Sequence, residues 1–280
     1  MKIVVTGAAG RLGSQVCRRL AGGPHEVRGT DMRYRGDVGV PVAVANLLQR
    51  ESCYGLLEGA GAVVHLGNHP SPFGRNAQIV FNENVTMNMN VLQAASEVGV
   101  RRVVFASSVQ AIAGSAKMGD SPRRSRLPYL PLDGDVPANP GNPYALSKAV
   151  TERMLDYYAV HHGMEAVAIR FPLLLTEEDA DRQLARAGNW TSSPWANLDE
   201  GCSWLPVAEA ADLVAKALDA ALPGYRVYFP ALRENYLKKP AEDVARELYP
   251  DVPRTVAGKP LELLVDTARI TAETGWSPSR

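Results

Sequence analysis

The chain has 280 residues, of which 46% are hydrophobic and 21% are charged. Its 30 Lys and Arg balance its 30 Asp and Glu, so the formal charge is zero. This balance excludes a basic domain that binds nucleic acid by neutralising phosphates. The composition is that of a globular protein, and the length predicts one large domain or a large domain with an appendage.

The hydropathy pattern and the cysteines bear on the cellular location. Segment 1–10 reads as a strand from the start and does not resemble a secretory signal, and no stretch approaches the ~18 consecutive apolar residues of a membrane span. Cys17, Cys53 and Cys202 are scattered without CxxC spacing, which predicts buried thiols and neither disulfides nor a zinc site. We expect a cytoplasmic protein with no membrane partner, no nucleic-acid partner and no metal.

Short apolar runs recur along the chain at intervals too long for hairpins, and each has the character of a buried parallel strand. The runs are 3–5, 27–29, 42–45, 62–66, 103–106 and 166–169. Segments with helical spacing lie between them, at 12–20, at 56–57 just before Gly59, at 80–98 and at 149–158. Strand alternating with helix predicts an α/β fold with a doubly wound parallel sheet, the Rossmann architecture.

Two long segments, 114–143 and 172–204, interrupt this rhythm and are rich in Pro, Gly, Ser and charged residues. Loops of this length usually line sites or act as lids. Farther along we expect a helix over 208–222, a strand over 225–229 and a helix over 240–248. The pattern therefore predicts a dinucleotide-binding domain over 1–170 and a smaller substrate-binding lobe over 171–280, interleaved with the first.

The first predicted strand leads directly into a glycine loop, TGAAGRLG at 6–13. Gly7 permits the tight turn, Gly10 lets the backbone approach a pyrophosphate, and Gly13 lets the next helix pack on the strand. The free N–H groups at the start of that helix suit an anion. Asp31 follows Gly13 by 31 − 13 = 18 residues, close to the ~20 expected for the acid that binds the adenosine ribose. These features predict a dinucleotide site.

Asp31 also bears on the choice of cofactor. A carboxylate beside the ribose accepts hydrogen bonds from both ribose hydroxyls and repels a 2′-phosphate, so NAD is favoured over NADP. Arg33 and Arg35 follow closely and could pair with that phosphate. NADP therefore stays open as the less favoured cofactor.

The reaction chemistry is indicated by Tyr144 and Lys148, which lie four residues apart on a predicted helix and so share one face. A Tyr hydroxyl titrates near ~10, and a nearby ammonium favours the phenolate. We expect Lys148 to lower the pKa of Tyr144 and to hold the nicotinamide ribose, while Tyr144 exchanges a proton with the substrate as hydride moves. Ser107 and Ser108 end a strand at the carboxyl edge, where a hydroxyl can bind the substrate oxygen.

Together these segments resemble the extended short-chain dehydrogenases/reductases, also called the NAD-dependent epimerase/dehydratase family, over most of the chain. The matching segments are TGAAGRLG at 6–13, VVHLG at 63–67, NV at 84–85, FASS at 105–108, NPYALSK at 142–148 and GWSP at 275–278. The resemblance implies that Ser108, Tyr144 and Lys148 are catalytic, with Ser108 preferred over Ser107. It further implies cofactor contacts at Gly7, Ala9, Gly10, Arg11, Leu12, Gly13, Asp31, Met32, Asn46, Leu47, Leu66, Gly67, Asn84, Ala106, Tyr144, Lys148 and Phe171.

Departures from the family pattern reduce the number of reactions and substrates that the resemblance allows. Val109 and Gln110 stand where the family's dehydratases carry Asp-Glu, so dehydration is disfavoured. Pro172 stands where sugar-nucleotide epimerases have an Asn that reaches the diphosphate, and the short second lobe suits a small substrate. Asn46 replaces an Asp near the adenine, which should alter one hydrogen bond. The resemblance thus implies hydride transfer between nicotinamide and a hydroxyl or carbonyl carbon of a small sugar or sugar acid.

Segment 65–73, HLGNHPSPF, is partly similar to the hexuronate dehydrogenases of this family, which oxidise a sugar acid at its anomeric carbon. The candidate substrate contacts are Asn68, His69, Ser71, Ser108, Gln110 and Arg182. His69 could equally be an exposed loop residue, and Arg182 with Arg186 could clamp a carboxylate or simply be solvated. Trp190, Trp195 and Trp204 could wall the site or pack the small lobe.

Two alternatives to the dehydrogenase stay open. One is a sugar or sugar-nucleotide epimerase that retains NAD, and the other is a non-catalytic NAD(P)-binding regulator. Such regulators generally lose the Tyr or the Lys, and this chain keeps both. The resemblance also implies a homodimer, in which helices over 76–98 and 143–161 meet their symmetry mates in a four-helix bundle.

Overall fold

A seven-stranded parallel sheet forms the centre of the computed structural model, which describes residues 1–33, 36–113, 127–176, 178–182, 198–255 and 258–279. The strand order is β3-β2-β1-β4-β5-β6-β9. The strands are β1 (Lys2–Thr6), β2 (Glu26–Asp31), β3 (Val42–Val44), β4 (Ala62–His65), β5 (Arg102–Ser108), β6 (Glu165–Phe171) and β9 (Tyr225–Tyr228). Since the order reverses between β1 and β4, the sheet is doubly wound, and the predicted fold class is confirmed.

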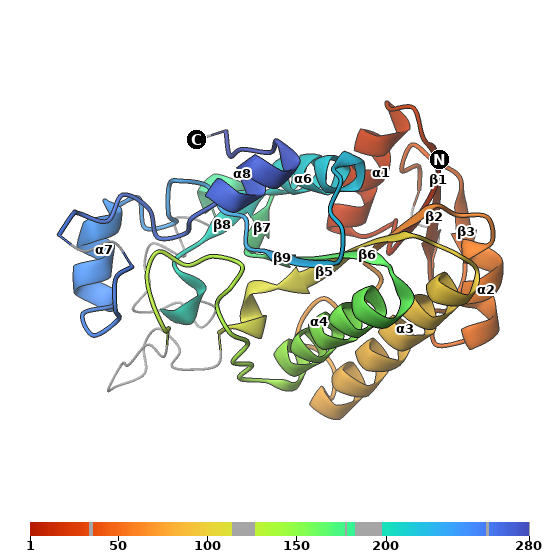
Figure 1. Cartoon of the computed structure of the whole chain (residues 1–280), viewed down its shortest axis with the longest axis horizontal. Helices are drawn as coiled ribbons and strands as arrows, with labels where there is room; N and C mark the ends of the chain where they lie inside the picture. The colour runs from red at the N-terminus through yellow and green to blue at the C-terminus, as the bar shows by residue number, and fades with distance from the viewer. Residues whose placement is uncertain (34–35, 114–126, 177, 183–197, 256–257, 280) are drawn as a thin grey trace.

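Helices cover both faces of the sheet (Figure 1). One layer holds α1 (Arg11–Ala21), α6 (Val207–Asp219) and α8 (Ala268–Thr274), and the other holds α2 (Arg50–Leu57), α3 (Ala77–Glu97) and α4 (Pro143–His162). Successive strand residues face opposite layers, so Ile3 and Val5 join one core cluster and Val4 joins the other. Burial on both faces explains why these strands appear in the sequence as unbroken apolar runs.

Local sequence signals fix both ends of α4. The Asn142 side chain caps the helix by accepting a 2.9 Å hydrogen bond from the N–H of Ala145, and Pro143 occupies the first turn, where its missing N–H costs nothing. Gly163 ends the helix with φ +65°, a left-handed conformation that favours glycine. The capped start holds Tyr144 and Lys148 in the first two turns, on the side that faces the ends of the central strands.

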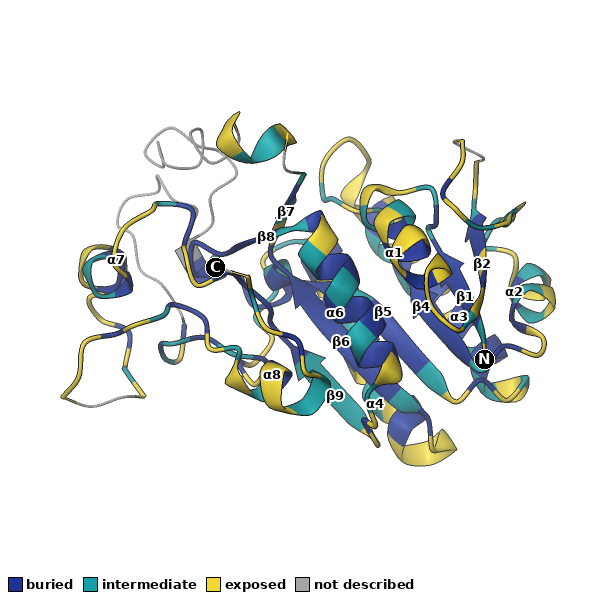
Figure 2. Ribbon diagram, turned by 90° about the horizontal axis from the view of Figure 1, so that it is seen from above, coloured by how far each residue is buried: buried dark blue, intermediate teal, exposed yellow. Residues whose placement is uncertain are grey.

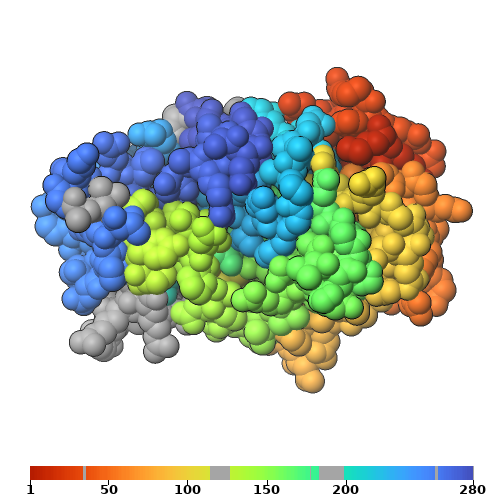
Figure 3. Space-filling view, viewed as in Figure 1, coloured from red at the N-terminus to blue at the C-terminus, as the bar shows by residue number. Residues whose placement is uncertain are grey.

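A smaller lobe lies beyond the carboxyl ends of β5 and β6 (Figure 1). It contains the two-stranded parallel sheet of β7 (Leu173–Leu175) and β8 (Trp204–Pro206), the 3₁₀ helix η2 (Leu198–Glu200) and α7 (Ala241–Leu248). Two elements between these lobe segments belong to the large sheet and its helix layer. β9 pairs with β6, and α6 lies beside α1 (Figure 2). Figure 3 shows the N-terminal residues at one end of the molecule and the segment around α7 at the other.

The cysteines and the helix lengths agree with a globular chain. Cys17, Cys53 and Cys202 are free and buried, as predicted, and burial raises their pKa to about 12, 11 and 11. Across the described segments, no helix combines the length and the apolar character needed to cross a bilayer.

Candidate active site

A cavity of about 840 Å³ runs along the carboxyl edge of the sheet. This volume lies within the roughly 300–1,000 Å³ of ligand sites. The glycine loop and Asp31 line one part, here called the dinucleotide end, and Ser108, Tyr144 and Lys148 line the other, here called the tyrosine end. In open α/β sheets ligands bind at this edge, where the strand order reverses.

Close backbone packing shapes the dinucleotide end. Gly7 has φ +68°, and a Cβ there would lie 2.9 Å from the Leu66 carbonyl carbon and oxygen. A Cβ on Gly13 would lie 2.0 Å from the Gly7 oxygen, so α1 can pack against the loop only without a side chain at this position. Gly10 and Arg11, at the N-terminus of α1, line the cavity and present the positive end of the helix dipole to it.

Asp31 is held in a fixed orientation at the end of β2. Its Oδ2 accepts a hydrogen bond from the N–H of Ala9 at 3.1 Å, and its Oδ1 accepts one from the N–H of Arg33 at 3.4 Å. The carboxylate therefore ties β2 to the glycine loop while it lines the cavity. A ribose with free hydroxyls fits beside such an acceptor, and a pyrophosphate fits the helix N-terminus, so the residues present fit a dinucleotide.

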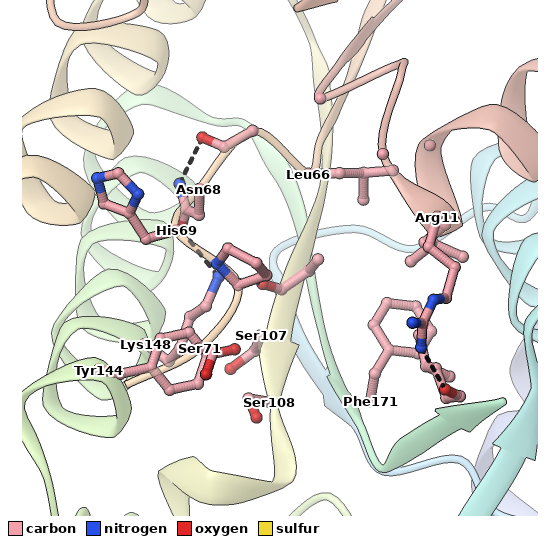
Figure 4. Close-up of a pocket in the computed structure, with 18 of the residues that line it drawn as sticks. Arg11, Leu66, Asn68, His69, Ser71, Ser107, Ser108, Tyr144, Lys148 and Phe171 are labelled. Atoms are coloured by element: carbon pink, nitrogen blue, oxygen red, sulfur yellow. Dashed lines mark hydrogen bonds between the residues drawn. The ribbon is translucent and has the colours of Figure 1, made fainter. Parts of the chain in front are cut away.

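Tyr144 and Lys148 project from α4 toward Ser108 on β5 (Figure 4). The Lys148 Nζ donates hydrogen bonds to Asn68 Oδ1 and to the Ala106 carbonyl, both at 2.8 Å. Burial lowers the pKa of Lys148 to about 7, against the opposing effect of Glu152. The ammonium lies 5.6 Å from the centroid of the Tyr144 ring.

The pKa of Tyr144 differs from the prediction. Burial raises it to about 12, the nearby Ser108 hydroxyl lowers it, and Glu200 raises it. The expectation of a lowered pKa is therefore wrong for this structure. The physical reason is that the Tyr144 hydroxyl is desolvated, while the Lys148 ammonium directs its hydrogen bonds to Asn68 and Ala106.

The two serines at the end of β5 have different partners. Ser107 Oγ donates a 2.6 Å hydrogen bond to Oε1 of Glu152, which forms a buried ion pair with Arg170. The Ser107 hydroxyl is therefore used within the protein core. Ser108 Oγ accepts a 3.2 Å hydrogen bond from the N–H of Gln110 and caps the 3₁₀ helix η1 (Val109–Ala111). The Ser108 hydroxyl also bonds the Tyr144 side chain, so Ser108 is the serine that suits contact with a substrate oxygen beside that tyrosine.

A buried chain of hydrogen bonds, which the sequence analysis missed, connects β1 to Lys148. Thr6 Oγ1 accepts from two backbone N–H groups after β4, so its proton goes to His65 Nδ1 at 2.7 Å. Burial lowers the pKa of His65 to about 3, which keeps the ring neutral, and its Nε2 then donates to Asn88 Oδ1 at 2.8 Å. Asn68 Nδ2 donates to the same oxygen at 2.6 Å. This chain fixes the Asn68 amide that holds Lys148.

Most of the predicted contacts line the cavity. At the cofactor positions these are Gly7, Gly10, Arg11, Leu12, Gly13, Asp31, Met32, Leu47, Leu66, Gly67, Ala106, Tyr144, Lys148 and Phe171, and at the substrate positions Asn68, His69, Ser71, Ser108 and Gln110. His69 is only partly exposed, and its ring is paired with Glu83.

Four predicted contacts lie outside the lining. Ala9 holds Asp31 through its N–H, and Asn46 uses its side-chain oxygen to accept from the N–H of Leu48 at 3.0 Å. Asn84 is buried in α3 and accepts from the N–H of His69 at 2.8 Å. Arg182 is exposed and paired with Asp179. Trp204 packs in the core of the small lobe, whereas Arg35, Arg186, Trp190 and Trp195 lie outside the described residues.

Glu200 is a cavity residue that no motif in the sequence indicated. It ends η2 and reaches the tyrosine end from the small lobe. Burial, together with the neighbouring Asp199, raises the pKa of its carboxyl to about 8. As for metals, His, Cys, Asp and Glu in the described ranges form no group of three or more that could hold an ion.

A glycine loop after β1, an acid at the end of β2 and a Tyr-Lys pair at the carboxyl edge of a doubly wound sheet define a dinucleotide-dependent oxidoreductase. Residues 3–228 match the model of the NAD dependent epimerase/dehydratase family, and the chain belongs to this family. NAD is thus the cofactor, and the dinucleotide end fits it.

Two relatives illustrate the similarity in sequence. L-arabinose 1-dehydrogenase (NAD(P)(+)) from Haloferax volcanii is 27% identical over 227 residues, which cover 79% of this chain and 84% of that protein. Uronate dehydrogenase from Pseudomonas putida is 26% identical over 237 residues, which cover 82% of this chain and 76% of that protein.

Solved structures show the same fold. A short-chain dehydrogenase/reductase superfamily protein from Agrobacterium tumefaciens with bound NAD has a TM-score of 0.73 and 23% identity, over 100% of this chain and 93% of that chain. UDP-glucose 4-epimerase from Brucella ovis in complex with NAD has a TM-score of 0.70 and 20% identity, over 99% of this chain and 93% of that chain.

Proposed function

We propose that the chain is an NAD-dependent dehydrogenase that transfers hydride between nicotinamide and a hydroxyl or carbonyl carbon of a small sugar or sugar acid. The observation that carries this proposal is the convergence of Ser108, Tyr144 and Lys148 at one end of a cavity whose other end fits a dinucleotide. The two relatives named above act on sugars of these classes by their names, L-arabinose and uronate.

Each end of the cavity has its own role, cofactor binding at the dinucleotide end and proton transfer at the tyrosine end. NAD, when bound, supplies the hydride acceptor or donor. Asp31 and the glycine loop would hold its ribose and pyrophosphate, and Asp31 favours NAD over NADP because it would repel a 2′-phosphate. Ser108 holds the reacting oxygen of the substrate, and Tyr144 removes or returns the proton on that oxygen. Lys148, whose ammonium lies 5.6 Å from the centroid of the Tyr144 ring, would hold the nicotinamide ribose.

The substitution Tyr144→Phe tests the proton-transfer role. We expect it to lower kcat by about 100-fold or more, because a positioned acid-base group contributes roughly 10²–10⁴ in rate. Turnover is measured as the nicotinamide absorbance change with NAD and a panel of free sugars and sugar acids. Tyr157→Phe is the matched control, because Tyr157 is exposed on the same helix, outside the cavity lining. Undiminished turnover by Tyr144→Phe would show that the assigned role is wrong.

The epimerase is the second candidate, since a UDP-glucose 4-epimerase from Azospirillum brasilense is 25% identical over 184 residues. An epimerase oxidises and then reduces the same bound sugar, so it accumulates almost no NADH, whereas a dehydrogenase forms NADH in proportion to substrate. A non-catalytic regulator is disfavoured because both Tyr144 and Lys148 are retained and line the cavity.

We also propose a homodimer that forms through α3 and α4. The supporting observation is that both helices carry large apolar side chains in solvent, among them Met89 on α3 and Tyr157 and Val160 on α4. A cytoplasmic location is part of the same proposal, and it is supported by the three free cysteines.

A further inference from the structure

Glu200 places a carboxyl group in the wall of the tyrosine end. It lines the cavity together with Ser108, Gln110 and Tyr144. Its backbone is held in place, because its carbonyl accepts hydrogen bonds from the N–H of Ser203 at 3.3 Å and from Ser203 Oγ at 2.6 Å. Within the described segments its carboxyl group forms no hydrogen bond and no ion pair, so it is free to bind a ligand.

Among the described residues, the ionisable groups that act on this carboxyl group are acidic or neutral. Asp199 lies next to it in η2 and adds a like charge, and Glu200 also interacts with Tyr144, Cys202 and Tyr236. The pKa of each of these three is raised, so each is neutral at neutral pH. These described neighbours therefore offer Glu200 no counter-ion.

The cations that line the described cavity are engaged elsewhere. Arg11 Nη1 donates to the Leu174 carbonyl at 3.2 Å, beside the glycine loop. Lys148 donates to Asn68 and Ala106. Among the described lining residues, a carboxylate ligand bound beside Glu200 would therefore find no cation that is free of other hydrogen bonds. Burying an unpaired charge in this way is strongly unfavourable.

We propose that Glu200 determines substrate specificity, by binding a hydroxyl group of an uncharged sugar and by excluding a sugar acid. This inference rests on the proposed function, since it concerns the substrate of the same site. A hydroxyl group suits Glu200 in either protonation state, because it both donates and accepts hydrogen bonds. A substrate carboxylate can only accept, and it would repel the ionised form of Glu200.

The test uses D-galactose and D-galacturonate, which differ only in a CH₂OH group against a carboxylate. Binding to the protein saturated with NADH is measured by calorimetry at pH 9, where Glu200, with its pKa of about 8, is ionised, and kcat/KM is measured with NAD at the same pH. We expect wild type to bind the neutral sugar at least about tenfold more tightly, the size that one polar contact supports. Glu200→Gln should reduce this ratio to about threefold or less, mainly through tighter binding of the acid, and Glu200→Lys should reverse it.

Glu178→Gln is the control, since Glu178 is an exposed acid outside the cavity lining, and it should leave the ratio unchanged. The inference is overturned if wild type binds the acid as tightly as the neutral sugar, if Glu200→Gln leaves the ratio unaltered, or if neither sugar binds. If NADH formed equally well from both sugars, the proposed dehydrogenase activity would be supported and the proposed role of Glu200 would be overturned. If the neutral sugar bound selectively but no sugar tested gave NADH, the role of Glu200 would be supported and the dehydrogenase activity would be overturned.

Discussion

Glu200 couples proton binding to folding, because its pKa of about 8 lies well above the ordinary value of 4.5. Between these two values the folded protein retains a proton that the unfolded chain has released. Stability therefore falls as pH rises through this window. Asp199 contributes to this shift from the adjacent position, while burial is the larger cause.

Glu200→Gln should remove this pH dependence, because the amide stays neutral in both states. We expect the variant to gain stability relative to wild type as pH rises from 5 to 8, by up to roughly 3 kcal/mol. The measurement is the free energy of unfolding in urea at several pH values, taken as the difference between the two proteins so that other titrating groups cancel. Stability curves that run parallel for the two proteins would contradict the prediction.

Residue spacing predicts neighbours better than it predicts protonation. The four-residue interval between Tyr144 and Lys148 was enough to place both on one helix face, and the structure brings both to the cavity. The direction of the Tyr144 pKa shift could not be predicted, because it depends on desolvation and on where Lys148 sends its hydrogen bonds. Those partners, Asn68 and Ala106, come from other elements of the chain.

A buried ion pair joins α4 to the centre of the sheet. Arg170 of β6 donates to both carboxylate oxygens of Glu152, with Nε–Oε1 2.9 Å and Nη2–Oε2 2.7 Å. Arg170 Nη1 also donates to the Val136 carbonyl at 2.6 Å, and Ser107 Oγ donates to Glu152 Oε1. The pair thus locks the helix that carries Tyr144 and Lys148 against the strand that carries Ser108.

Glu152→Gln should lower stability by about 3–5 kcal/mol, since it leaves the Arg170 charge buried without a counter-ion. Asp156→Asn, one turn farther along α4, is the control, because Asp156 and Arg153 form an exposed pair at 3.9 Å, and it should cost less than about 1 kcal/mol. Urea unfolding of both variants measures the two costs. Equal costs would mean that the buried pair does not hold α4 in place.

The sequence predicted the long elements more completely than the short ones. The apolar runs of the large sheet are visible because both faces of each strand are buried. By contrast, β7 and β8 have three residues each, and they pair with each other across 28 intervening residues (204 − 175 − 1). η2, which brings Glu200 to the cavity, is equally short. Such elements depend on tertiary pairing, so no local periodicity indicates them.

At the scale of the whole molecule, the cavity is assembled from both parts of the chain. The large sheet supplies the glycine loop, Asp31 and the Tyr-Lys pair, whereas η2 of the small lobe supplies Glu200. The parts that would bind the cofactor are thus built into the parallel sheet, and the residue proposed to contact the substrate comes from the lobe beyond it. If Glu200 contacts the substrate as proposed, changes in the small lobe alter substrate choice without disturbing the dinucleotide end.

The outer faces of α3 and α4 determine the proposed assembly. Val160 is 70% exposed and Tyr157 is 51% exposed on α4, and Met89 is 46% exposed on the neighbouring α3. We expect Val160→Glu to convert the homodimer to a monomer, because two-fold symmetry repeats each new charge within an apolar interface. Light scattering at micromolar concentration measures the mass.

Val44→Glu is the matched control, since Val44 is 64% exposed on β3, the edge strand of the large sheet, away from α3 and α4. It adds the same charge to an exposed valine and should leave the dimer intact. A wild-type protein with the mass of one chain would contradict the proposed assembly, and so would a Val160→Glu variant with the mass of two. If Val44→Glu alone dissociated the protein, the interface would involve the edge of the sheet in place of the two helices.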